Sequence, residues 1–314
     1  MPARYIVATI AIATLPRVAW AHTGRAPEPH DLWSAWTLAP GVIVSLAIGA
    51  WLYARGVRAL WSAAGRGRGV ARWRAACFAG GMLTVALALL SPIDAVGSAL
   101  FSVHMTQHML LVVVAAPLIM LGDPPTAMLW AFSVGARRRI GLAWREWRVG
   151  RAIWHQLRRP LVAWTLHVGA LWLWHLPTLY GAALRDERIH VLEHATFFLT
   201  ALLFWSVLTE RRPRHRLNVG AGTLYLFTAA LQCTLLGALM SFARHAWYFG
   251  HYGTTAAWGL TPLEDQQIAG LIMWIPAGTA YLVALIPTVL PALRAPAQWV
   301  ASPTAAGVSA RGTP

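Results

Sequence analysis

Lysine is absent from this chain of 314 residues and cysteine is nearly absent, and each shortage excludes something. The only two cysteines, Cys77 and Cys233, lie far apart and form no C-x-x-C motif, which argues against a disulfide framework or a thiolate cluster. Charged residues are also scarce, at 12%, yet the formal net charge is +15 because all 26 basic residues are arginine. In a soluble domain such a charge would suggest a nucleic-acid partner.

The chain is instead rich in apolar residues, at 57%, and these occur in runs of about 20 residues, the length that crosses a bilayer. Most arginines lie in short loops between these runs, so we interpret the positive charge as an orientation signal, with membrane lipid and not nucleic acid as the partner. The pattern predicts an all-α integral membrane protein with seven transmembrane helices. The predicted spans are 36–54, 72–91, 104–122, 161–177, 190–208, 220–242 and 267–290.

The arginines also predict which way the chain enters the membrane. If residues 22–35 lie outside, 20 arginines fall in cytoplasmic segments and only four in outer segments. The positive-inside rule then predicts an extracytoplasmic amino end and a cytoplasmic carboxyl end. The longest loop, about 123–160, is predicted to be cytoplasmic and to lie on anionic lipid.

The two ends of the chain are predicted to lie outside the membrane domain. Residues 1–21 combine Arg4, an apolar stretch and the A-x-A pattern at 19–21, which is typical of a cleaved signal peptide, with an uncleaved anchor as the alternative. The seven-span membrane domain would then cover 22–291. Residues 292–314 are rich in Ala, Pro, Gly and Ser and are predicted to form a disordered cytoplasmic tail.

Histidines gather at the predicted outer ends of the spans. His104 and His108 open the third span, His190 and His194 open the fifth, and His175 closes the fourth. Residues four apart share one face of a helix, so each pair presents two imidazoles to one point. Ionisable residues inside membranes are costly and usually functional. We therefore predict that these five histidines form a metal site facing the exterior.

Copper is the predicted metal. Imidazole suits zinc, copper, iron and nickel, whereas thioether sulfur favours Cu(I). We expect further ligands or supporting groups among Met105, Met109, His167, Glu193, Met240, Asp265 and His22.

Four members of that second set have specific predicted roles. Glu193 and Asp265 could orient ligating imidazoles as hydrogen-bond acceptors. His167 lies about 12 Å deeper than His175, given the helical rise of 1.5 Å per residue, and is either a packing residue or a deeper ligand. After cleavage, His22 would be the first residue and could chelate copper through its amine and ring.

Four motifs in order resemble those of the multi-span CtaG-type cytochrome c oxidase assembly factors. They are His104-Met-Thr-Gln-His108 with the later Leu-Gly-Asp-Pro, Trp174-His175-Leu-Pro-Thr-Leu-Tyr180, His190-x-x-Glu193-His194-Ala-Thr-Phe, and Trp258-Gly-Leu-Thr-Pro-Leu-Glu264-Asp265-Gln266-Gln267. The resemblance implies a non-enzymatic chaperone in the bacterial inner membrane that helps to mature the copper centre of an oxidase subunit. It does not account for His245 and His251, and it leaves a homo-oligomer open.

Three other functions fit parts of the pattern. A copper permease would need ligands at depth, for which His167, Cys233 and Met273 are the only candidates. A membrane cytochrome would ligate haem iron with two histidines from different helices. A zinc hydrolase with Glu193 as base is the weakest alternative, because the H-E-x-x-H order is missing.

Overall fold

The computed structural model describes residues 26–210 and 216–294, and within these ranges the chain is helical with no strand. The predicted signal peptide (1–21), His22 and the tail beyond residue 294 lie outside the described residues. The α-helices are α1 (Pro40–Ala64), α2 (Arg72–Leu90), α3 (Pro92–Gly97), α4 (Phe101–Met109), α5 (Ala116–Leu121), α6 (Pro124–Leu129), α7 (Val134–Glu146), α8 (Arg148–Leu157), α9 (Pro160–Trp174), α10 (Pro177–Arg185), α11 (Glu187–Leu208), α12 (Val219–Ser241) and α13 (Pro262–Arg294). The shorter elements are η1 (Pro29–Asp31), the π-helical η2 (Leu110–Ala115), η4 (Phe249–His251) and η5 (Thr255–Trp258).

Six helices of the described part are long and apolar enough to cross a membrane. They are α1, α2, the continuous helix from α4 through η2 to α5, and α11, α12 and α13. The predicted span 161–177 corresponds to α9, which has only 15 residues. At 1.5 Å per residue α9 is about 22 Å long, shorter than a hydrocarbon core of about 30 Å. Pro160 and Pro177 fix this length, because proline is accepted at the first turn of a helix and not in its interior.

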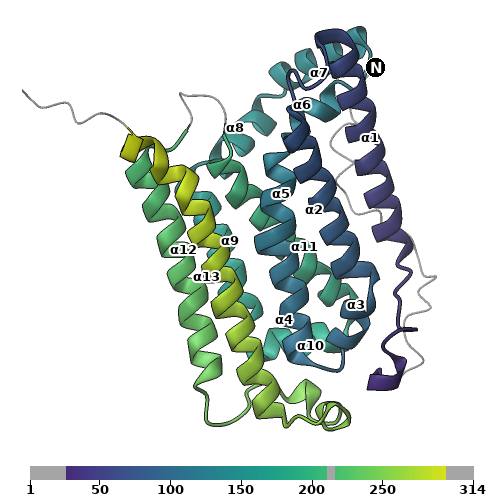
Figure 1. Cartoon of the computed structure of the whole chain (residues 1–314), viewed down its shortest axis with the longest axis vertical. Coiled ribbons are helices and arrows are strands. Elements are labelled where there is room, and N and C mark those ends of the chain that lie inside the picture. Colours follow the sequence, from purple (N-terminus) through teal and green to yellow (C-terminus); the bar gives the residue numbers. More distant parts are fainter. Residues whose placement is uncertain (1–25, 211–215, 295–314) are drawn as a thin grey trace, which may run out of the picture.

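The long helices lie side by side in one bundle (Figure 1). At one end of the bundle lie α6, α7 and α8, and at the other lie α3 and α10 (Figure 1). The helix α9 runs between these two ends and packs against α11 and α12. Many of the predicted cytoplasmic arginines belong to α7, α8 and the connection between α1 and α2, all at the same end.

Two tertiary contacts hold the helices that frame the site. The helices α12 and α13 meet backbone to backbone, since a Cβ built on Gly270 would lie 2.5 Å from the carbonyl oxygen of Gly237. In η2 the π-helical turn disturbs the regular hydrogen bonds, and the Trp205 indole N–H donates to the Val112 carbonyl at 2.9 Å. This bond ties the irregular turn of the central helix to α11.

Candidate metal centre

The predicted histidine pairs from α4 and α11 face each other inside the bundle. Within each pair, His104 with His108 and His190 with His194, the ring centroids are 4.3 Å apart. Across the helices the centroids are 5.4 Å apart for His104 and His190 and 5.0 Å apart for His108 and His194. The prediction that these four imidazoles converge is met by the geometry.

The carboxylate of Glu193 lies between the two imidazoles of α4. Its oxygens are 3.7 Å from Nε2 of His104 and 3.9 Å from Nε2 of His108, which is too long for a hydrogen bond. All three side chains are at least 98% buried. A carboxylate without charge compensation is costly in such surroundings, so this arrangement favours a cation between the three groups.

The potential ligand atoms form two overlapping groups. His104 belongs to both, once with His190 and His194 and once with His108 and Glu193, and within each group the atoms lie within 4.8 Å of one another. Nε2 of His104, His108 and His194 and Oε2 of Glu193 are buried and have no hydrogen-bond partner among the described residues. Unpaired buried polar atoms each cost free energy. A metal ion at this point would satisfy several of them together, so the residues fit a metal.

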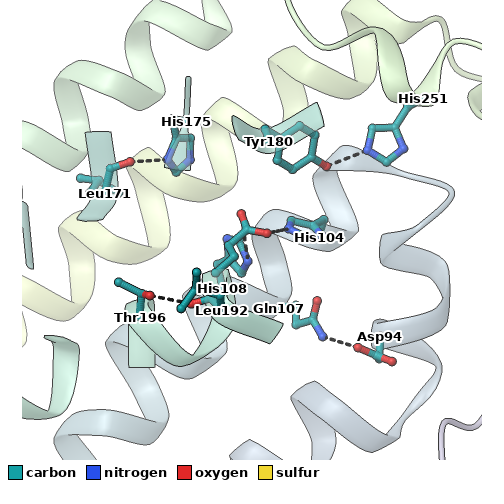
Figure 2. Close-up of polar contacts among 11 residues, drawn as sticks. Asp94, His104, Gln107, His108, Leu171, His175, Tyr180, Leu192, Thr196 and His251 are labelled. Carbon is teal, nitrogen blue, oxygen red and sulfur yellow. Dashed lines mark hydrogen bonds and ion pairs between the residues drawn. The ribbon is translucent and has the colours of Figure 1, made fainter. Parts of the chain in front are cut away.

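His175 lies outside both groups. It follows the last residue of α9, and its Nδ1 lies 2.6 Å from the carbonyl oxygen of Leu171 (Figure 2). Because a carbonyl oxygen only accepts, Nδ1 carries the proton, and Nε2 is left as a buried lone pair without a partner. The ring of Phe197 contacts both His175 and His108, at centroid distances of 6.1 and 4.6 Å. His175 is therefore a neighbour of the cluster, and Phe197 contacts both His175 and His108.

The methionines are apolar packing residues in this structure. Met105 and Met240 are fully buried in the main hydrophobic core, and Met109 is nearly so. The converging groups described above comprise imidazole nitrogens and one carboxylate. A thioether contribution to the metal centre stays a prediction. His167 is buried two turns before the end of α9 and also lies outside these groups.

Asp265 was predicted to orient an imidazole, but its carboxylate is fully engaged elsewhere. It accepts hydrogen bonds from the backbone N–H groups of Phe101 and Ser102, at 2.7 and 3.0 Å, and from the Ser102 hydroxyl at 2.5 Å. These groups form the first turn of α4, where a negative charge also interacts favourably with the helix dipole. Asp265 therefore anchors the helix that carries His104 and His108.

A tyrosine and a sixth histidine adjoin the cluster, and the sequence assigned them no role. The Tyr180 hydroxyl lies 2.7 Å from Nε2 of His251 (Figure 2), and the Tyr180 ring stands edge-on to His104 at 5.3 Å. Burial lowers the pKa of His251 and raises the pKa of Tyr180, so both groups are neutral and the phenol donates. The only local hint was the position of Tyr180 at the end of the Trp174 motif. His245, by contrast, is exposed.

The comparison with known families gives one match. The sequence model described as "Cytochrome c oxidase caa3 assembly factor (Caa3_CtaG)" matches residues 51–295. This range includes all five predicted metal ligands and both residues of the Tyr180 and His251 pair. No solved structure matches the chain significantly.

Curated relatives come from mycobacteria and carry no functional name. An uncharacterised protein of Mycobacterium leprae is 26% identical over 194 residues, which is 60% of this chain and 29% of the relative. Uncharacterised proteins of Mycobacterium bovis and Mycobacterium tuberculosis are each 27% identical over 188 residues, which is 59% of this chain and 28% of theirs. The matched segment is thus less than a third of the length of these relatives.

Proposed function

The chain belongs to the cytochrome c oxidase caa3 assembly factor family, and we propose that it serves oxidase assembly by binding copper at the cluster of His104, His108, His190, His194 and Glu193. The observation that carries the proposal is the set of buried imidazole and carboxylate atoms that converge without hydrogen-bond partners. Copper is cargo in this proposal, passed on to an oxidase subunit. The protein itself catalyses no reaction.

The donor set supports copper over other metals. Four imidazoles and one carboxylate offer nitrogen and oxygen ligands, and for such sites affinity among divalent first-row metals peaks at copper. No cysteine closes the site, since Cys77 and Cys233 lie outside both converging groups. A set of imidazoles and one carboxylate without thiolate exchanges its metal more readily than a thiolate cage, which suits a protein that must release its cargo.

The proposed orientation places this centre at the outer face of a bacterial cell membrane. The arginine-rich helices α7 and α8 occupy one end of the bundle, and the positive-inside rule assigns that end to the cytoplasm. The cluster lies toward the other end, near α3 and α10, where copper from outside reaches it first. In this proposal α9 makes a seventh crossing.

Haem is a poorer occupant than a single ion. A porphyrin needs its two axial imidazoles on opposite sides of a wide flat ring. Here the rings of His104 and His108 contact those of His190 and His194 at centroid distances of 5.0 to 5.7 Å, so no macrocycle fits among them. A copper permease is the second candidate, because a small cavity lined by His108, His167 and Cys233 lies inward of the cluster.

Metal analysis of the purified protein tests the proposal. We expect the wild type to retain copper and the His104→Ala and His108→Ala variants to lose most of it, while cells that carry either variant in place of the wild type lose oxidase activity. His245→Ala is the matched control, since His245 is exposed on the same side of the bundle. Its copper content and oxidase activity should equal those of the wild type.

Two results would overturn the proposal. One is an unchanged copper content in both cluster variants. The other is normal oxidase activity in cells whose cluster variants bind no copper, which would separate the metal from the role in assembly. Membrane extracts probed for the protein show whether each variant is present at the level of the wild type.

A further inference from the structure

A small cavity lies deeper in the bundle than the proposed metal centre. It has a volume of about 10 Å³, room for about one water molecule, and lies where α9, α12 and α13 meet the central helix. Its chemically active lining residues are His108, Met109, His167, His175, Cys233 and Tyr281. His108 thus lines the cavity and also belongs to the metal centre, so the two sites adjoin.

The deep donors are only loosely engaged. The Cys233 thiol donates to the carbonyl oxygen of Met273 at 3.5 Å. The His167 ring has two contacts, Nδ1 with the Thr200 hydroxyl and Nε2 with the Tyr281 hydroxyl, both also 3.5 Å long. The two His167 contacts are at the long limit for hydrogen bonds between nitrogen and oxygen, and a thiol is a weak donor, so a ligand would displace little bonding energy.

An independent observation also points to a ligand in this cavity. His108 and His175 both line it, are 99% and 93% buried, and have ring nitrogens without hydrogen-bond partners among the described residues. The protonated Nδ1 of His175 is held by Leu171 (Figure 2), so Nε2 is the free lone pair. A buried lone pair beside a cavity of this size needs a proton donor or a cation.

We propose that the cavity binds one Cu(I) ion through the Cys233 sulfur and an imidazole of His175 or His167, with the Met109 thioether beside it. Thiolate and thioether sulfur select Cu(I), in contrast to the nitrogen and oxygen donors of the outer centre. The incoming Cu(I) replaces the thiol proton of Cys233, and the proton leaves to solvent. No electron is transferred and the net charge of the cavity stays the same, so burial of the ion adds no uncompensated charge.

The site needs fewer ligands than the outer centre. Ligand atoms of three residues do not converge here as they do around His104, where they lie within 4.8 Å. Cu(I) accepts two ligands in a line, so one sulfur and one imidazole suffice. This inference rests on the proposed function only for the choice of copper. It adds a sulfur-containing copper site inward of the outer centre.

Titration of the purified full-length protein under reducing conditions tests this site, with Cu(I) delivered from a coloured competing chelator. We expect Cys233→Ser to bind one equivalent less than the wild type and to lose the sulfur ligand seen by X-ray absorption. Cys77→Ser is the matched control and should bind as the wild type does, because Cys77 lies on α2 away from the cavity. His104→Ala should keep the equivalent that depends on Cys233.

Equal stoichiometry in the two cysteine variants would overturn the deep site and leave the outer centre untouched. A second measurement covers the case that Cys233→Ser does not fold. In the Cys77→Ser background, Ag(I), a redox-inert substitute for Cu(I), should slow the reaction of the one remaining thiol with a small methanethiosulfonate reagent at least tenfold. Reaction at the same rate with and without Ag(I) would also overturn the proposal.

Discussion

Replacement of Asp265 should weaken the metal centre although this residue touches none of the proposed ligands. Its carboxylate accepts two backbone N–H bonds and one hydroxyl bond from the first turn of α4. Alanine would leave the N–H groups of Phe101 and Ser102 buried without an acceptor. His104 lies on the next turn of the same helix, so a displaced first turn would also displace the His104 imidazole.

The size of the effect follows from these bonds. Hydrogen bonds to a charged group contribute about 1.5–3 kcal/mol each, so the loss of the two backbone bonds alone in Asp265→Ala should cost about 3–6 kcal/mol of stability. For a chain of this size that lowers the thermal midpoint by roughly 6–12 °C. Asp265→Asn retains one acceptor oxygen and should lose about half as much. Loss of a group that orients ligands typically lowers metal affinity about 10–100-fold, and we expect at least the lower value for Asp265→Ala.

The assay is thermal unfolding in detergent followed by copper titration of the same samples. Glu264→Gln is the control, since Glu264 is exposed, precedes Asp265 directly and keeps an oxygen that accepts from Thr261. It should change stability by less than about 0.5 kcal/mol. If Asp265→Ala matched this control in both measurements, the anchoring role assigned to Asp265 would be wrong.

Two further substitutions test how the helices are held together. Gly270→Val should prevent α12 and α13 from packing, because its Cβ would lie 2.5 Å from a backbone oxygen of the facing glycine, and its elution from a sizing column should change. The control is Gly278→Val, whose Cβ meets nothing within 4 Å and which should elute as the wild type does. Identical elution of both variants would contradict the backbone contact. Trp205→Phe should cost about 1–3 kcal/mol by leaving the Val112 carbonyl in η2 unpaired. In thermal unfolding it should fall below Trp164→Phe, whose wild-type indole N–H has no partner in the described part of the chain, and equal midpoints would refute the role of this bond.

Much of the fold could be predicted from the sequence because helical membrane spans have a local signature. Six predicted spans correspond to six long helices, and the differences have physical causes. The first was predicted to end at residue 54, before Arg55, yet α1 continues to Ala64. The Arg55 guanidinium donates to the Ala131 carbonyl just after α6, so the charged side chain has a partner and α1 continues past it. The fourth predicted span is too short as α9 because Pro177 starts a new helix.

The metal centre was predictable to the extent that its geometry is local. Spacing of four residues places His104 with His108 on one face of α4, and the same holds on α11. Which further residues join depends on how helices turn toward one another, and the sequence carries no such information. Met105 and Met240 lie in the hydrophobic core, and their part in metal binding stays a prediction. His175 lies beside the cluster, where Phe197 contacts both it and His108, and only the packing reveals this.

The residues that sequence reasoning could not place are those that hold the central helix. The helix α4 begins the continuous 21-residue helix Phe101–Leu121, and both its start and its irregular turn are held by distant residues. Its start is tied by Asp265, 164 residues away, and the π-helical turn after it is tied by Trp205. Such long-range bonds leave no periodic trace in the sequence. The position of His104 and His108 relative to α11 is thus set by α13 and by the tryptophan, and the metal centre is a property of the whole bundle.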